Sequence, residues 1–270
     1  ASAGQVLIAI QDRNRWGQQL YIDNVNVGAS VQVNAIAWLE GPFETSTLLM
    51  RDDLRVAGLL PLQEPYSGLG FTQASGGGGE VVDPAVFTVS GPNAITDWVL
   101  LELRANVSPF GVVATRSALL QRDGDIVGLD GISPVTFQAS PGTYRLAVRH
   151  RNHLGIMRGS GNALTATPLT IDFRLSATTT YGTAARKAIG AAQVMWAGNA
   201  RRDAVLKYTG SNNDRDPVLV RVGSTTPNNV VTGYFLEDVN LSGTVKYTGT
   251  ANDRDPILVN IGSTTPNNTR

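Results

Sequence analysis

Residues 207–229 read KYTGSNNDRDPVLVRVGSTTPNN, and residues 246–268 read KYTGTANDRDPILVNIGSTTPNN. The two copies keep one offset along their whole length (246 − 207 = 39). A repeat of this size is typical of a supersecondary unit that is used twice and buries its apolar face against its neighbour. The sequence therefore predicts a tandem-repeat domain at 177–270, with copies at about 199–229 and 238–268.

The second copy opens with a candidate calcium loop. Residues 238–245 read DVNLSGTV, which fits the pattern D-x-N-x-S-G-x-V. In such a loop alternate side chains supply oxygens, a glycine makes the sharp turn, and the next residue offers its backbone carbonyl. Because calcium takes about six to eight oxygens, we expect acids of the later NDRD segment to complete the shell. The candidate ligands in this copy are Asp238, Asn240, Ser242, Thr244, Asp253 and Asp255.

The first copy departs from this pattern. It has Asn199 at the first position, Arg201 at the third and Ala204 in place of the glycine. A guanidinium cannot coordinate a cation, so the sequence favours calcium in the second loop over the first. For either loop, the alternative is a metal-free turn stabilised by Asx hydrogen bonds. The candidate ligands in this copy are Asn199, Asp203, Asp214 and Asp216.

A short helix is predicted after each loop. In the second copy, Asp255 suits the N-cap and Pro256 the first helical position. Gly262 is expected to end the helix. A loop followed by one helix, present twice, resembles the dockerin domain, in which two calcium loop-helix units pack together. The loop of this chain is longer than a dockerin loop, since Asp255 is the eighteenth residue counted from Asp238. The segment KYTGTA is therefore interpreted as an insertion.

Composition favours a mainly β protein. Of the 270 residues, 42% are hydrophobic and only 16% are charged, and there are 29 glycines. The 22 basic and 22 acidic residues balance, so no charge excess points to nucleic acid as a partner. The chain has no cysteine, which excludes disulfides and thiolate metal sites. No apolar run approaches the roughly 20 residues of a membrane span, and none is expected.

Upstream of the repeats, short apolar runs predict an immunoglobulin-like or transthyretin-like β-sandwich at 29–176. Residues 95–104 are apolar on both faces, so this strand is expected to be central. Helical character is predicted within 48–60 and at 184–194. The predicted strands are 85–90, 95–104, 111–121, 134–139, 143–151 and 169–175.

Two stretches carry resemblances to β domains. Residues 141–144 read PGTY and resemble the tyrosine-bearing entry to a late strand of immunoglobulin-like and transthyretin-like sandwiches, which implies that Tyr144 anchors its hydroxyl to nearby backbone. Residues 1–28 are interpreted as the end of an upstream β domain, since LYIDNVNV resembles the closing strand of carbohydrate-binding jelly rolls. The alternative is a plain N-terminal hairpin, with strands at 5–10 and 19–27.

Two further groups could carry chemistry. His150 and His153 would point to opposite faces of a strand, which favours a structural role over a metal or catalytic pair. Asp123, Asp125 and Asp130 lie in Asp-Gly turns that offer a second place for calcium. No Gly-x-Ser-x-Gly elbow occurs, and no spacing selects a carboxylate pair, so enzyme activity is not expected.

A wider resemblance covers about residues 38–270. Segments such as MRDDLR, GLLPLQEPY, ATRSALLQRDGD, AVRHRNHLG and both KYTG-x-x-NDRDP blocks look like the C-terminal region of large secreted proteins of Bacteroidota, many of them labelled haemagglutinin or adhesin. The resemblance implies an extracellular or cell-surface protein.

The sequence thus predicts a secreted, non-catalytic adhesion or assembly module with a calcium-stabilised, dockerin-like tail. Its expected partners are proteins or glycans at the cell exterior, or copies of itself. One alternative is a subunit of an extracellular fibre that is joined by docking of chain ends. Another is an accessory region of a carbohydrate-active enzyme whose catalytic domain lies upstream.

Overall fold

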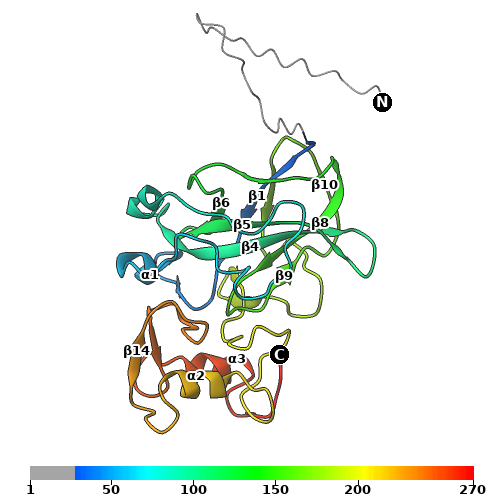
Figure 1. Cartoon of the computed structure of the whole chain (residues 1–270). Coiled ribbons are helices and arrows are strands. Elements are labelled where there is room, and N and C mark those ends of the chain that lie inside the picture. Colours follow the sequence, from blue (N-terminus) through cyan, green and yellow to red (C-terminus); the bar gives the residue numbers. More distant parts are fainter. Residues whose placement is uncertain (1–27) are drawn as a thin grey trace, which may run out of the picture.

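The computed structural model describes residues 28–270, in which a curled β-sheet stands next to the repeat region (Figure 1). The chain is mainly β, with 31% strand and 9% helix, as predicted. The strands predicted at 5–10 and 19–27 lie outside the described residues. No helix within 28–270 is long and apolar enough to cross a membrane.

The elements follow one another in this order: β1 Val31–Ile36, β2 Phe43–Glu44, β3 Leu49–Met50, α1 Asp53–Val56, the 3₁₀ helix η1 Pro84–Thr88, β4 Ile95–Ala105, β5 Val112–Gln121, β6 Asp125–Val127, β7 Val135–Phe137, β8 Gly142–Arg149, β9 Ile156–Met157, β10 Asn162–Leu164, β11 Leu169–Asp172, β12 Lys187–Ile189, β13 Ala192–Val194, α2 Arg215–Arg221, β14 Val230–Thr232, β15 Thr244–Lys246 and α3 Arg254–Asn260.

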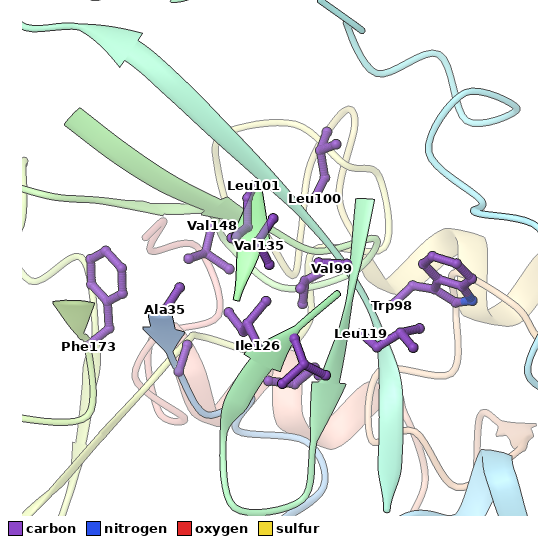
Figure 2. Close-up of a cluster of buried hydrophobic side chains, with 14 of the residues drawn as sticks. Ala35, Trp98, Val99, Leu100, Leu101, Leu119, Ile126, Val135, Val148 and Phe173 are labelled. Carbon is purple, nitrogen blue, oxygen red and sulfur yellow. The ribbon is translucent and has the colours of Figure 1, made fainter. Parts of the chain in front are cut away.

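Strand β4 is an inner strand of the main sheet, between β8 and β5. The sheet runs β10-β8-β4-β5-β6-β1-β11, with β7 paired to β1 and β9 paired to β8. Its strands pair antiparallel, except that β1 and β11 are parallel. The first nine residues of β4 are all buried, which confirms the prediction of a central strand covered on both faces. Figure 2 shows Leu101, Val135 and Val148 packed together on one side of it.

The segment between α1 and η1 covers the second face of β4. The Trp98 indole N–H donates to the Pro61 carbonyl at 2.9 Å. The Tyr66 hydroxyl donates to the backbone carbonyl of Trp98 at 2.7 Å. Both aromatic side chains are fully buried. A loop of little regular structure therefore completes the core. It can do so because the polar groups of both buried aromatic side chains form hydrogen bonds with backbone carbonyls.

Two predicted elements are wrong. Residues 85–90 were expected to be a strand but contain η1, because the Asp83 carboxylate accepts the Ala85 N–H at 2.8 Å and Pro84 suits the first turn. Residues 184–194 were expected to be helical but contain the hairpin β12–β13. The hairpin is favoured over a helix because β13 continues into Met195, which forms a β-bridge with Leu39 beside the main sheet. The helical character expected within 48–60 is limited to the short α1.

The two repeat copies share one small core, as predicted. Helices α2 and α3 lie side by side in Figure 1, and the hairpin β14–β15 flanks them. The buried residues of this core are Val218, Val222, Val245 and Ile257.

The copies also exchange hydrogen bonds reciprocally. The Thr209 hydroxyl of the first copy donates to the Pro266 carbonyl of the second at 3.0 Å. The Thr248 hydroxyl of the second copy donates to the Pro227 carbonyl of the first at 3.2 Å. Each KYTG segment therefore contacts the STTPNN segment of the other copy, which explains why both motifs occur twice.

The predicted role of Tyr144 is confirmed, and it can be tested. Its hydroxyl donates to the Ser140 carbonyl at 2.8 Å. We predict that Tyr144→Phe lowers the free energy of unfolding by about 1 kcal/mol, the usual net value of one hydrogen bond. Urea denaturation of the unmodified protein and of Tyr144→Phe measures this difference in the free energy of unfolding. The exposed Tyr181 serves as control, and an equal effect of Tyr181→Phe would contradict the assignment.

Candidate metal centre and its junction with the sheet

One aspartate closes each repeat loop in the same way. The Asp253 carboxylate accepts the N–H of Val239 at 2.9 Å and that of Lys246 at 2.8 Å. In the first copy, the Asp214 carboxylate accepts the N–H of Arg201 at 3.0 Å and that of Lys207 at 2.8 Å. Both aspartates are fully buried. Each carboxylate therefore fastens the start of its loop to its KYTG segment.

The opening turn of the second loop gathers oxygen atoms. The Asp238 carboxylate accepts the N–H groups of Ser242 and Gly243 at 2.9 and 2.8 Å. The Asn240 side-chain oxygen accepts the same Ser242 N–H at 3.0 Å. The Ser242 hydroxyl lies 3.1 Å from the Thr244 carbonyl. The glycine that the pattern requires is Gly243, with a φ of +80°. Oxygens from the four predicted positions thus surround one turn.

Two buried carboxylates lie close to each other in this loop. Burial raises the pKa of Asp238 to about 6. Burial, and then the charge of Asp238, raise the pKa of Asp253 to about 8. Repulsion between buried like charges is relieved by a proton or by a cation. The loop therefore has the electrostatic character of a cation site.

Asp255 and Asp216 do not take the place that was predicted for them. The Asp255 carboxylate accepts from the Asn252 side-chain amide at 2.8 Å, and the Asp255 N–H donates back to the Asn252 oxygen at 2.8 Å. Asp216 and Asn213 form the same reciprocal pair. The side-chain oxygens of Asn252 and Asn213 therefore accept an N–H from the first turn of α3 and of α2. The N-cap of α3 is Asp253, so the prediction of Asp255 at that position is wrong. Asp255 and Asp216 also pair with the neighbouring arginine. Because the KYTG insertion lengthens the loop, Asp253 and Asp214 return to its start instead.

The first loop offers fewer oxygens. Its Asn199 amide donates to the Asp203 carbonyl at 2.7 Å, while the Asn199 side-chain oxygen is buried without a partner among residues 28–270. The Asp203 carboxylate turns to the Val205 N–H at 2.9 Å. Asp214 is left as the one buried carboxylate of this loop, with a pKa raised by burial to about 6. The residues fit a cation less well than those of the second loop.

Any cation in the second loop would depend on mixed ligands. Within residues 28–270, no three or more His, Asp or Glu side chains come together as a metal-binding group. Amide, hydroxyl and backbone oxygens would have to supplement the two carboxylates, as calcium sites allow. At the other candidate place, Asp123 accepts the Asp125 N–H and Asp130 accepts the Ser133 N–H, so both carboxylates stabilise turns.

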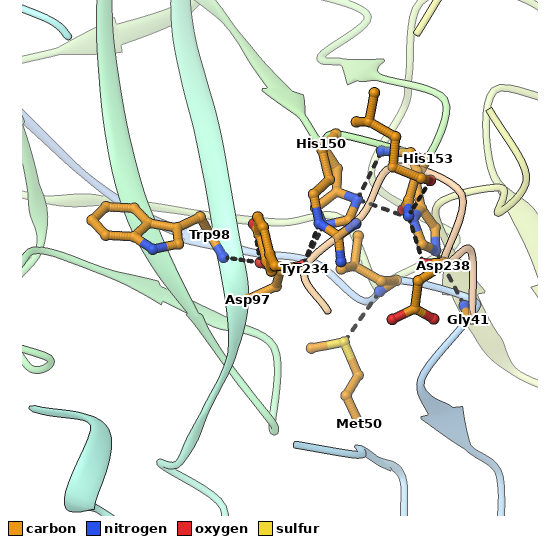
Figure 3. Close-up of polar contacts among 12 residues, drawn as sticks. Gly41, Met50, Asp97, Trp98, His150, His153, Tyr234 and Asp238 are labelled. Atoms are coloured by element: carbon orange, nitrogen blue, oxygen red, sulfur yellow. Dashed lines mark hydrogen bonds and ion pairs between the residues drawn. The ribbon is translucent and has the colours of Figure 1, made fainter. Parts of the chain in front are cut away.

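A buried polar network joins the sheet to the repeat region (Figure 3). Its centre is Asp97 of β4, which is fully buried. One carboxylate oxygen accepts from the Tyr234 hydroxyl at 2.6 Å. The other lies 3.1 Å from His150 Nε2 and 3.0 Å from Arg151 Nε. Despite its burial, the Arg151 charge and these hydrogen bonds lower the pKa of Asp97 to about 2, so the carboxylate is ionised.

The two histidines meet in this network, contrary to the expectation that they point apart. Strand β8 ends at Arg149, so His150 and His153 lie beyond it and are free of its alternation. Their Nδ1 atoms are 3.0 Å apart. Because the Gly41 N–H donates to His153 Nε2 at 3.1 Å, His153 carries its proton on Nδ1 and His150 carries its own on Nε2, towards Asp97. Both rings are neutral structural links.

The same network holds the second loop. The Asn152 side-chain amide donates to the carbonyls of Leu236 and Asp238, at 3.0 and 2.7 Å. Arg51 donates to the Asn240 carbonyl at 2.8 Å. A Cβ on Gly41 would lie 2.3 Å from the Val239 carbonyl oxygen, so this contact requires glycine. The candidate cation site is thus built against the sheet.

Sequence reasoning missed Asp97, Asn152 and Gly41. Asp97 left one signal, since it is an acid inside the largely apolar run ITDWVLLEL, and a buried acid requires partners. Asn152 and Gly41 left none, because their partners lie far away in the chain.

Comparison of the chain with protein-family models, curated proteins and solved structures finds no match.

The close approach at Gly41 can be tested by substitution. We predict that Gly41→Ala destabilises the protein by about 1–3 kcal/mol, the cost of forcing an extra carbon into a packed contact. Gly111→Ala is the matched control, because nothing lies within 4 Å of a Cβ at that exposed position. Denaturant unfolding measures both. Equal stability of the two variants would contradict a tight junction at Gly41.

The neutral histidine pair predicts a pH dependence. Burial, and then the positive charge of Arg151, hold the pKa of His153 well below its ordinary value. The unfolded chain therefore takes up a proton below about pH 6.5 that the folded chain does not, so the stability linked to His153 is lost as pH falls. The stability difference between the protein and His153→Gln should shrink by about 1.4 kcal/mol per pH unit below pH 6.5. A difference that is constant with pH, from denaturant unfolding at pH 7 to 5, would rule this out.

Proposed function

We propose that this chain is a secreted or cell-surface module for adhesion or assembly, whose tail is stabilised by calcium in the second repeat loop. In this proposal the sheet is an immunoglobulin-like or transthyretin-like domain and the repeats are a dockerin-like pair. The resemblance of residues 38–270 to secreted adhesins supports the setting, and the architecture of the second loop supports the role of calcium.

The observation that carries the proposal is the pairing of Asp238 and Asp253. Both carboxylates are buried, and burial together with mutual repulsion raises the pKa of Asp253 to about 8. A calcium ion would be held by Asp238, Asn240, Ser242, the Thr244 carbonyl and Asp253. Its charge would neutralise the two carboxylates and so stabilise the fold of the loop.

The junction with the sheet gives such an ion a mechanical consequence. Asn152 binds the Asp238 carbonyl, and Arg51 binds the Asn240 carbonyl. Leu241, between the loop's candidate ligands, is buried in the core of the main sheet. Ordering this loop therefore also orders the contact between the tail and the sheet, which suits a protein that transmits force or presents a surface outside the cell.

The buried network supports a non-catalytic interpretation. Asp97, His150 and His153 together would be a plausible acid-base set at an open site. All three side chains are buried at no more than 2% exposure, and their polar atoms face one another or the backbone. A substrate has no access to them in this arrangement.

Calcium dependence is the first test. We predict that millimolar calcium raises the melting temperature relative to EDTA, because a ligand that binds only the native state stabilises it by about 2.7 kcal/mol at a hundredfold excess over Kd. Each kcal/mol corresponds to about 2–4 °C for a chain of this size. Differential scanning calorimetry measures the shift. Identical melting in EDTA and calcium would refute the metal site.

Three asparagine substitutions locate the ion. Asp253→Asn should abolish the calcium-dependent shift, because it removes one of the two buried carboxylates of the second loop. Asp214→Asn, the equivalent change in the first loop, should keep it. Asp255→Asn should keep it as well, because the Asp255 carboxylate pairs with Asn252 and Arg254 and not with the start of the loop. Loss of the shift in Asp255→Asn but not in Asp253→Asn would reverse the assignment.

Sedimentation and binding assays separate adhesion from fibre formation. An adhesion module should sediment as a monomer and bind glycans or cells. A fibre subunit should sediment as a polymer, with one chain end docked on the next copy. Polymerisation of the purified chain would therefore favour the fibre subunit over the adhesion module.

A further inference from the structure

A pocket of about 420 Å³ lies where the first repeat loop meets the sheet. Four arginines line it: Arg104 from β4, Arg149 at the end of β8, and the neighbouring Arg201 and Arg202 from the first loop. Phe71 contributes an aromatic ring, and Glu102 is the one carboxylate of the lining. In a chain of zero net charge, this concentration of arginine is a local feature.

Most of this positive charge has no acidic partner within residues 28–270. The Glu102 carboxylate is paired with Arg104, whose Nε donates to it at 2.7 Å. Arg202 donates to the Leu69 carbonyl, and its Nε is buried without a partner.

Arg149 and Arg201 are the least occupied members of the group. Neither forms a side-chain hydrogen bond or ion pair with any described residue. The charge of Arg201 acts to lower the pKa of Asp214 and of Asp216, but neither carboxylate forms an ion pair with it, and Asp216 pairs with Arg215. The guanidinium groups of Arg149 and Arg201 are therefore available to a ligand.

The repeat supplies an internal comparison. Arg201 and Arg202 correspond to Asn240 and Leu241 of the second copy, at the same offset of 39 residues (240 − 201 = 39). Arg202 and Leu241 share one left-handed backbone conformation, with φ of +60° and +56°. The loop shape therefore does not require arginine. The first copy has fewer candidate calcium ligands than the second and carries two cationic side chains at a pocket.

The lining defines the ligand. A guanidinium matches a planar or tetrahedral oxyanion with paired N–H donors. The Phe71 ring offers an apolar face beside Arg149, whose guanidinium carbon lies 5.7 Å from the ring centroid, and the volume suits one small ligand. We propose that this pocket binds a sugar that carries a carboxylate or sulfate group. The anionic group follows from the arginines, whereas the sugar rests on the proposed adhesive function.

Titration calorimetry of the full chain in calcium buffer tests the site. The probes are glucuronic acid, glucose 6-sulfate and neutral glucose. We expect saturable binding of at least one charged sugar and none of glucose. Arg149→Gln and Arg201→Asn should each weaken binding at least tenfold, the second by installing the residue of the other copy. Arg215→Gln is the matched control, since Arg215 pairs with Asp216 outside the pocket.

The outcomes separate the pocket from the calcium proposal. No binding of either charged sugar, equal binding of glucose, or unchanged affinity in Arg149→Gln would each overturn the site. Melting curves of every variant establish that it is folded. If calcium leaves the melting temperature unchanged while the chain binds glucuronic acid through Arg149, the metal loop is refuted and the pocket is supported.

Discussion

The buried carboxylate of Asp97 is the constraint on which the junction depends. It lies in the central strand, where an unpaired charge would cost several kcal/mol. Four donors satisfy it: the Trp98 N–H, the Tyr234 hydroxyl, His150 and Arg151. These come from β4, from the segment after β8 and from the repeat region. Burying one charge therefore requires all three parts to be in place together, and the Arg151 side chain reaches on to the Phe235 carbonyl.

The repeat region depends on a second kind of constraint, which is reciprocity. Each copy closes its own loop with one buried aspartate and contacts the other copy through threonine. Neither copy has more than a few buried apolar residues, so neither could form a stable core alone. The KYTG insertion is part of this arrangement, because it carries both the N–H that binds the closing aspartate and the threonine that contacts the neighbour.

The copies differ where they face the sheet. In the second, Leu241 enters the main core and the acidic loop is held by Asn152 and Arg51. In the first, Arg201 and Arg202 line a pocket instead. The two copies thus carry side chains of opposite charge where they face the sheet, on one repeated loop.

By itself, the sequence determined the mainly β composition, the central strand, the Tyr144 contact and the repeat with its shared core, because each depends on local patterning or on an offset visible in the chain. The loop oxygens of Asp238, Asn240 and Ser242 were predicted for the same reason. Only the tertiary structure decided that Asp253 rather than Asp255 returns to the loop, since that depends on the path of the insertion. It also decided that residues 184–194 pair as strands beside the sheet, and that His150 and His153 meet once β8 has ended. Long-range contacts outweigh local propensity in all three, and no local pattern encodes them.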